Sequence, residues 1–292
     1  MLIQQIGNGV FLGAVYALFA CGYALVFGVL DILNLAHAAI YMSAAFIALA
    51  LAGAGVPLLL AIVLAIIAAG LLGILLDRVA FAPLRRRNAG TLAPLISSIG
   101  VAIMIQGIAR AFFGSDDQPF PSGTFATAQL QIGSLRLGVV DVTVLGVAIA
   151  MMLALSSVLR FTSLGRSIRA VAADRIAAAL LGIDVERTIA LTFFIASALG
   201  GAAGVLIGLE FNSVSVDMGA RIELKGLAII VLGGMGSVTG AVVGALLLGC
   251  VETLSVAYIS SGYRDAISFG VMFLVLVLRP TGLFGRRSLR AA

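Results

Sequence analysis

The chain has 292 residues, 62% of them hydrophobic and only 11% charged, and its 18 basic and 13 acidic side chains give a formal net charge of +5. Because a soluble domain is about half apolar and about a quarter charged, this composition excludes an ordinary soluble fold and predicts a protein that lies in membrane lipid. The basic residues lie in short loops between apolar runs, which favours a role in membrane orientation over nucleic-acid binding. Cys21 and Cys250 lie within apolar stretches, so we expect them to pack and not to form a disulfide.

Eight apolar stretches are each long enough to form a membrane-spanning helix, which needs about 20 residues. They predict an all-α polytopic membrane protein in which residues 1–292 form a single transmembrane domain. The first stretch lacks a basic leader and a small-residue cleavage site, so we expect a retained span and not a signal peptide. The predicted spans are residues 6–29, 35–53, 56–80, 92–113, 138–160, 188–209, 239–259 and 265–284.

Arginines concentrate in three segments and predict the orientation of the chain. By the positive-inside rule these segments face the cytoplasm, and counting back through the spans places the N-terminus outside. The loops near 210–223 and 260–264 are then both outside. The arginines concerned are Arg78, Arg85, Arg86 and Arg87; Arg160, Arg166, Arg169, Arg175 and Arg187; and Arg279, Arg286, Arg287 and Arg290.

The short apolar segment 226–236 has too few residues to cross a membrane. Because the loops before and after this region are both predicted to lie outside, the chain must enter and return. We expect a re-entrant half-helix that breaks at Gly233, Gly234 and Gly236 and returns through 239–259. Irregular backbone inside a membrane needs protein or water around it, so these glycines are candidates to line a translocation pathway. A glycine-rich helix that packs closely against a neighbour is the alternative.

The segment 165–187 is too polar to span a membrane and too long for a simple turn. Residues 167–181 are good helix formers, and Gly182 suits the left-handed position that ends a helix. We expect a short cytoplasmic helix with an alanine-rich face that docks on a cytoplasmic partner, and a solvated connecting helix is the alternative. The side chains expected to point to water are Arg169, Asp174 and Arg175.

The sequence RAVAADRIAAALLGID in this segment resembles the coupling loop of permeases that import branched-chain amino acids. More loosely it resembles the Glu-Ala-Ala-x-x-x-Gly loop by which permeases of ATP-binding-cassette (ABC) importers rest on their ATPases. Here Ile176 replaces the glutamate before Ala177 and Ala178, and Gly182 follows. Three further stretches, spread over nearly the whole chain, are similar to the same permease family. They are GNGVFLGAVYALFACGYALVFGVLDILNLAHAAIYMSAAF, KGLAIIVLGGMGSVTGAVVGALLLG and LRPTGLFG.

The resemblance implies a permease subunit of a bacterial-type inner membrane that forms half of a translocation pathway and has no catalytic residues. It also implies a second related permease subunit, two cytoplasmic ATPase subunits that use ATP and magnesium, and an extracytoplasmic solute-binding protein. The chain itself is expected to bind no cofactor and no metal. Leucine, isoleucine and valine are the implied solutes, while other amino acids, amides and urea remain open. The residues expected to couple the chain to its ATPases are Arg169, Asp174, Arg175, Ala177, Ala178, Gly182 and Ile183.

Polar groups concentrate between the first two predicted spans, from Asp31 to His37, which is the only histidine. Polar residues inside membranes are often functional, so Asn34 and His37 are candidates to touch the transport path. The alternatives are Asn34 as the N-cap of the second helix and His37 as a packing residue. Tyr16 and Tyr41 are further candidates for the same cavity, although tyrosines in spans also serve as packing or interface residues.

Small residues four positions apart predict close approach of helix backbones. Near the outer end of the seventh predicted span, Glu252 is expected to pair with Arg264 across a short loop. The glycines at this spacing are Gly9 and Gly13; Gly200, Gly204 and Gly208; and Gly236, Gly240 and Gly244.

Several functional classes are excluded by missing motifs. The only lysine, Lys225, follows Leu224, so the sequence has no G-x-x-x-x-G-K-[ST] loop for nucleotide. One histidine excludes a multi-histidine metal site, and Ser237 lacks the turn of a membrane-embedded serine protease. A stand-alone ion-coupled transporter and a passive small-solute channel remain as alternatives, and neither predicts a coupling helix.

Overall fold

A computed structural model of the chain describes residues 2–87, 89–90, 92–121, 129–132, 135–279 and 282–284. The elements of the first half are α1 (Leu2–Leu30), α2 (His37–Gly53), α3 (Leu58–Leu76), a π-helical turn (Asp77–Phe81), α4 (Ala82–Arg86), α5 (Leu92–Phe113), β1 (Gln129–Ile132) and β2 (Leu135–Gly138). Those of the second half are α6 (Val139–Phe161), α7 (Ser163–Ala173), α8 (Arg175–Leu180), α9 (Val185–Glu210), α10 (Met218–Gly233), α11 (Val238–Tyr258), a 3-10 turn (Ser261–Tyr263) and α12 (Arg264–Leu278).

The prediction of a polytopic helical membrane protein is confirmed. Within the described residues, seven helices are long and apolar enough to cross a membrane. They are Leu2–Leu30, Leu58–Arg86, Leu92–Phe113, Val139–Phe161, Val185–Glu210, Val238–Tyr258 and Ser261–Leu278.

The second predicted span, 35–53, is shorter than expected and is not among these seven helices. It forms α2, a 17-residue apolar helix that begins at His37. Leu35 and Ala36 belong instead to a turn, in which Asn34 accepts a hydrogen bond from the Ala36 amide at 3.2 Å. At the C-terminal side, α12 ends at Leu278 and not at the predicted residue 284.

Two further elements differ from the sequence prediction. A short antiparallel hairpin, β1–β2, precedes α6, although an all-α fold was predicted. The segment predicted as a half-helix over 226–236 belongs to the longer helix α10, which begins at Met218. Its first turns contain polar residues such as Arg221 and Glu223, so they were not recognised as part of an apolar run.

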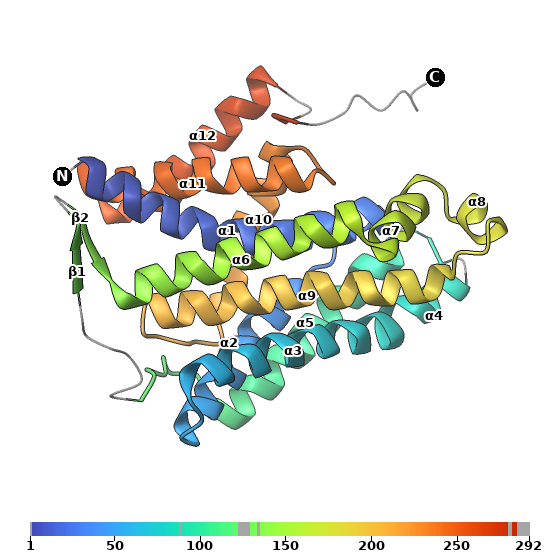
Figure 1. Ribbon diagram of the computed structural model, residues 1–292, viewed down its shortest axis with the longest axis horizontal. Helices are drawn as coiled ribbons and strands as arrows, with labels where there is room; N and C mark the ends of the chain where they lie inside the picture. The colour runs from blue at the N-terminus through green and yellow to red at the C-terminus, as the bar shows by residue number, and fades with distance from the viewer. Residues whose placement is uncertain are drawn as a thin grey trace.

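The core is built around α1, which packs antiparallel to α11 and also contacts α9 and α6 (Figure 1). Close approach depends on the predicted glycines: a Cβ on Gly9 would lie 2.7 Å from the Cα of Cys250, and one on Gly13 would lie 2.8 Å from the Cα of Leu246. Most residues of α1 and α9 are buried, whereas few residues of α5, α6 and α12 are. The outer helices are therefore free to contact lipid or another subunit.

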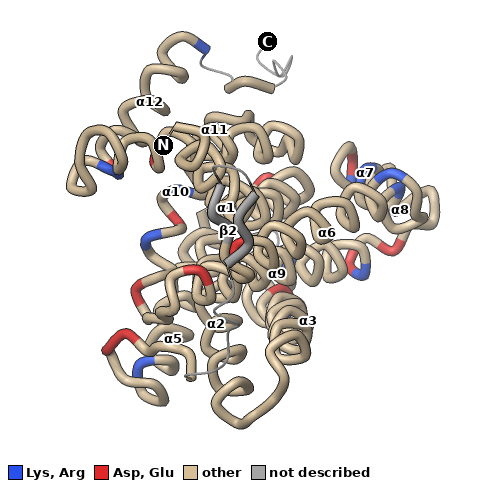
Figure 2. Tube along the Cα trace, turned by 60° about the vertical axis from the view of Figure 1, so that its left-hand side comes forward, with Lys and Arg blue, Asp and Glu red and all other residues tan. Residues whose placement is uncertain are grey.

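The two arginine-rich loops within the described residues lie at the same end of the bundle. α4 is at this end together with α7 and α8, while the N-terminus and the β-hairpin are at the other (Figure 1). Charged residues gather at helix ends and turns, and the helix bodies are almost free of them (Figure 2). We refer to the α4, α7 and α8 side as the predicted cytoplasmic end, and to the opposite side as the outer end.

Candidate functional site

The segment 165–187 forms two helices where one was predicted. The break is at Asp174, whose backbone is extended and whose side chain caps α8 by accepting hydrogen bonds from the amides of Ile176 and Ala177 at 2.8 and 3.0 Å. Aspartate stabilises a helix more as an N-cap than in the interior, so the chain begins a new helix here. Gly182, with φ of +81°, follows the end of α8, as predicted.

Of the three alanines of α8, only Ala178 is turned inward. Ala178 is 2% exposed and packs in the core, so it offers no docking surface. Ala177 is exposed and Ile183 is half-buried. The most exposed apolar side chains are Ile176 (76%), Leu180 (84%) and Leu181 (81%), which we call the α8 tip.

Arg175 does not point to water, contrary to prediction. Its Nη2 donates to the carbonyl oxygens of Val29 at 3.1 Å and Leu30 at 2.8 Å, at the end of α1. Those carbonyls have no partner within their own helix, and a cation is favourable at a helix C-terminus. Burial lowers the pKa of Arg175, and the charge of Arg85 lowers it further, but arginine keeps its proton in proteins. Arg169 is exposed, although its guanidinium also donates to the carbonyl oxygen of Leu159.

A second polar link joins α4 to α9 at the predicted cytoplasmic end. Arg85 pairs with buried Asp77 at 2.5 Å and with Glu186 at 2.9 Å. Because Asp77 lies in the π-helical turn and Glu186 in the first turn of α9, this arginine holds two spanning helices together.

Asn34 and His37 are buried inside the bundle. His37 is 1% exposed, its Nε2 lies 3.3 Å from the carbonyl oxygen of Phe19, and its ring packs against Phe19 and Tyr23. A Cβ on Gly200 would lie 2.7 Å from the His37 ring, so α9 also encloses it. Asn34 is not the N-cap of α2: that residue is Ala36.

The predicted glycine break is present between α10 and α11. α10 ends at Gly233, and Gly234 and Gly236 adopt φ of +102° and +79°, which side chains with a Cβ rarely adopt. Gly236 lies beside Gly28, near the cytoplasmic end of α1. The turn therefore lies on the predicted cytoplasmic side of the bundle, whereas α10 begins beside Ala38, at the start of α2.

The C-terminal segment closes this turn. The amides of Leu283 and Phe284 donate to the carbonyl oxygens of Leu232 and Gly233 at 2.8 and 3.0 Å. The last carbonyls of α10 thus have partners, as backbone inside a membrane requires. Two of the stretches that resemble the permease family thus meet here, one through Leu232 and Gly233 and the other through Leu283 and Phe284.

Two neighbouring cavities lie at the outer end. The larger has a volume of about 480 Å³ and the smaller about 210 Å³, and both are lined by Ile207, Phe211 and Arg264. Tyr16 and Tyr41 line the smaller cavity. Of the other predicted pathway residues, neither cavity is lined by Asn34, His37, Gly233, Gly234 or Gly236.

A charge cluster joins the helices around these cavities. Glu252 of α11 is fully buried and pairs with Arg264, as predicted, but also with Lys225 of α10 at 2.5 Å. Lys225 lies 3.1 Å from Asp265 and donates to the hydroxyl of Tyr16 at 3.3 Å. The cluster therefore ties α1, α10, α11 and α12 together.

Sequence reasoning missed Lys225, Glu210 and Asp141 at this end of the molecule. Lys225 is the only lysine and lies in an apolar stretch, which is a signal for a functional or paired charge. Glu210 and Asp141 lie at the ends of α9 and α6 and line the larger cavity. Nothing local in the sequence brings them together.

Similarity to known proteins extends over nearly the whole chain. The family model described as "Branched-chain amino acid transport system / permease component" matches residues 5–276. The high-affinity branched-chain amino acid transport system permease proteins LivH of Escherichia coli K12 and BraD of Pseudomonas aeruginosa are each 36% identical to this chain, over 97% of it and 96% of their own length. The fructose import permease protein FruG of Bifidobacterium longum is 26% identical over 84% of this chain and 74% of its own length. No solved structure shows significant similarity. With its spanning helices, the chain is a multi-pass inner-membrane protein, and it belongs to the family of branched-chain amino acid transport system permease components.

Proposed function

We propose that this chain is the permease subunit of an ATP-driven ABC importer and forms half of the translocation pathway for branched-chain amino acids or related small solutes. The observation that carries the proposal is α8, whose apolar tip is exposed at the predicted cytoplasmic end while Arg175 binds the end of α1. An ion-coupled transporter or a passive channel has no use for such an element. Family membership favours the same choice.

The α8 tip is suited to dock in a groove on a cytoplasmic ATPase. Its three large apolar side chains have no cover within the described residues, and helices commonly place such side chains into apolar grooves of a partner. Of the predicted coupling residues, Ala177 and Gly182 remain on the exposed side, whereas Asp174, Arg175 and Ala178 hold the element in place. We assign docking to the tip and positioning to these three residues.

Movement of the ATPase would reach the membrane helices through Arg175. An equilibrium between inward-open and outward-open states shifts only if docking contacts differ between the states. Since α1 packs against α11 and α9, displacement of its cytoplasmic end is passed to the helices that line the outer cavities.

In the proposed topology, α2 is an eighth, short pass and α10 is a re-entrant helix. α2 begins at His37, inside the bundle between α1 and α9, and the 16 residues of α10 are too few for a hydrocarbon core of about 30 Å at 1.5 Å per residue. The glycine turn and the C-terminal segment supply the backbone partners that such an arrangement needs.

In the proposed assembly, other subunits supply the second half of the pathway, the delivery of solute and the hydrolysis of ATP. A second related permease subunit would cover exposed apolar helices and complete the pathway, and an extracytoplasmic binding protein would deliver solute to the outer end. Two ATPase subunits would bind ATP and magnesium, so the chain itself needs no cofactor.

Co-purification tests the proposal. The tagged chain is expressed together with the second permease subunit and the ATPase subunits. We expect the tag to recover all of these subunits as one complex. Leu181→Asp, which places a charge on the α8 tip, should lose the ATPases but keep the permease pair. Ser163→Asp, which places a charge at an exposed residue at the start of α7, is the control. Retention of the ATPases by Leu181→Asp, or solute transport by the chain alone, would contradict the proposal.

A further inference from the structure

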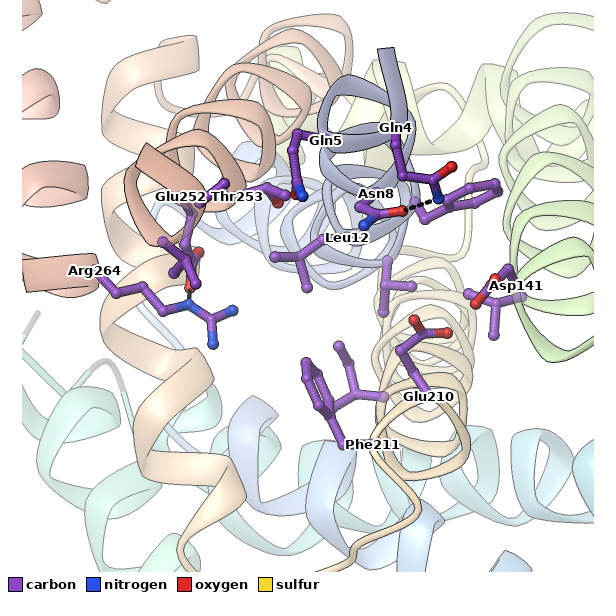
Figure 3. Close-up of a pocket in the computed structure, with 16 residues that line it drawn as sticks. Gln4, Gln5, Asn8, Leu12, Asp141, Glu210, Phe211, Glu252, Thr253 and Arg264 are labelled. Carbon is purple, nitrogen blue, oxygen red and sulfur yellow. Dashed lines mark hydrogen bonds and ion pairs between the residues drawn. The ribbon is translucent and has the colours of Figure 1, made fainter. Parts of the chain in front are cut away.

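The larger outer cavity has opposite charges on facing walls. Arg264 enters from α12, and Glu210 and Asp141 lie across the cavity from it, with apolar Leu12 and Phe211 between the two walls (Figure 3). The carboxyl groups of Glu210 and Asp141 lie close to each other on this wall (Figure 3). The volume of about 480 Å³ is within the range of about 300–1,000 Å³ that is common for small-molecule sites.

Glu252, on the Arg264 side, is buried but only half satisfied. Its Oε1 pairs with Lys225 and Arg264, whereas its Oε2 has no hydrogen-bond partner within the described part of the chain. Glu252 is 0% exposed and lines the cavity. Because an unpaired buried carboxylate oxygen is unfavourable, a donor from a bound molecule would complete this wall.

Arg264 offers the complementary group next to this oxygen. Its Nε faces Glu252, and its two terminal nitrogens point into the cavity (Figure 3). A guanidinium presents a fork of donors that matches a carboxylate in two parallel hydrogen bonds. Acceptor and donor therefore lie side by side, as do the ammonium and carboxylate of an α-amino acid.

We propose that Glu252 and Arg264 form the head-group subsite for an α-amino acid with an apolar side chain. The Oε2 of Glu252 accepts from the solute ammonium, the terminal nitrogens of Arg264 donate to the solute carboxylate, and the side chain lies against Leu12 and Phe211. This inference rests on the proposed function and selects amino acids over amides, urea and sugars as the solute.

The remaining charges favour one orientation of the solute. Lys225 stays paired with Glu252, so the buried carboxylate keeps a second cationic partner when the terminal nitrogens of Arg264 bind the solute. The negative charge of Glu210 and Asp141 on the opposite wall repels a carboxylate and directs it to Arg264.

Photo-crosslinking in the assembled importer tests the subsite. A photoreactive leucine that keeps its ammonium and carboxylate should label peptides that contain Phe211 or Leu12. Excess leucine should displace the label, while leucinamide, which lacks the carboxylate, and 4-methylpentanoate, which lacks the ammonium, should compete about tenfold less well or worse. Equal competition by all three compounds in the parent protein would overturn the proposal, and this comparison needs no variant.

Variants of Arg264 and Glu252 test which of them binds the solute carboxylate and which binds the ammonium. Arg264→Gln should weaken competition by leucine about tenfold or more and abolish discrimination against leucinamide. Glu252→Gln should abolish discrimination against 4-methylpentanoate. Arg110→Gln, at an exposed arginine of the outer end that pairs with Asp217, should leave labelling unchanged. Discrimination that survives in both cavity variants would overturn the assignment.

Uptake of labelled leucine, measured in parallel, separates the two proposals. If the parent importer takes up leucine but the cavity is not labelled, the subsite is wrong and the proposed function stands. If the parent assembles but takes up no amino acid, the proposed solute class is wrong, and the subsite with it.

Discussion

The Arg175 guanidinium donates a hydrogen bond to the carbonyl oxygen of Leu30 at 2.8 Å, so the first residue of α8 holds the last residue of α1. The two residues are 145 positions apart in the chain. The contact joins α8, which carries the exposed tip, to the end of α1. In the proposed importer, Arg175 would therefore be a positioning residue for the coupling of ATP hydrolysis to transport.

Loss of this contact should uncouple ATP hydrolysis from transport while the subunits of the importer stay together. Hydrogen bonds from a charged donor contribute about 1.5–3 kcal/mol, so Arg175→Ala should reduce solute-stimulated ATP hydrolysis several-fold while the ATPases stay bound. Arg175→Lys should give an intermediate effect, because an ammonium lacks the fixed fork of a guanidinium. Arg166→Ala, at an exposed arginine of α7, is the control. Parental stimulation in Arg175→Ala would show that the contact carries no coupling.

Gly182 should be required for the end of α8. Because φ is +81° there, Gly182→Ala should destabilise the turn by about 1–2 kcal/mol. The expected result is faster tryptic cleavage next to Arg175 or Arg187. Gly53→Ala serves as a control, because a Cβ there meets nothing within 4 Å and φ is not positive. Cleavage at the parental rate in Gly182→Ala would mean that α8 tolerates the strain.

Hydropathy predicted the spans well because length and apolarity alone decide which segments cross a membrane. The fifth helix, Leu92–Phe113, has the predicted bounds. The start of α2 was not predictable, because Leu35 and Ala36 are as apolar as a span. Their turn depends on distant contacts, such as the hydrogen bond from the Leu35 amide to the hydroxyl of Ser98 at 3.2 Å.

In the candidate sites too, contacts between residues close in sequence were predictable, and contacts between distant residues were not. The Glu252–Arg264 pair was predictable because a short loop joins the two residues, whereas Lys225 reaches Glu252 from 27 positions away. In α8, alanine content predicted a docking face, but packing decides which side is covered, and Ala178 is on the covered side. Composition identified the element, and only the fold identified its exposed residues.

Neutralising Glu252 should destabilise the outer half of the protein. Removal of one partner of a buried ion pair costs about 3–5 kcal/mol, because the other charge stays buried. Glu252→Gln should therefore lower the unfolding temperature in detergent clearly. Asp217→Asn removes the partner of Arg110 in an exposed pair, where a loss below about 1 kcal/mol is expected. Equal effects of the two changes would contradict a structural role for the charge cluster.

Orientation is tested by labelling of single cysteines. Residues exposed at the two ends, Arg86 and Ser261, are suitable sites. A cysteine at Arg86 should react with an impermeant maleimide only from the cytoplasmic side, and one at Ser261 only from outside. The reverse pattern would invert the topology, and would place α8 where no ATPase could reach it.

Transport in proteoliposomes tests the central claim most directly. Vesicles would contain this chain, its partner permease and the ATPases, with the binding protein and labelled leucine on the outer side. We predict accumulation of leucine that requires ATP and magnesium on the ATPase side and persists after ionophores have collapsed all ion gradients. Accumulation that needs an ion gradient and no ATP, or simple equilibration of leucine across the membrane without ATP, would contradict the account.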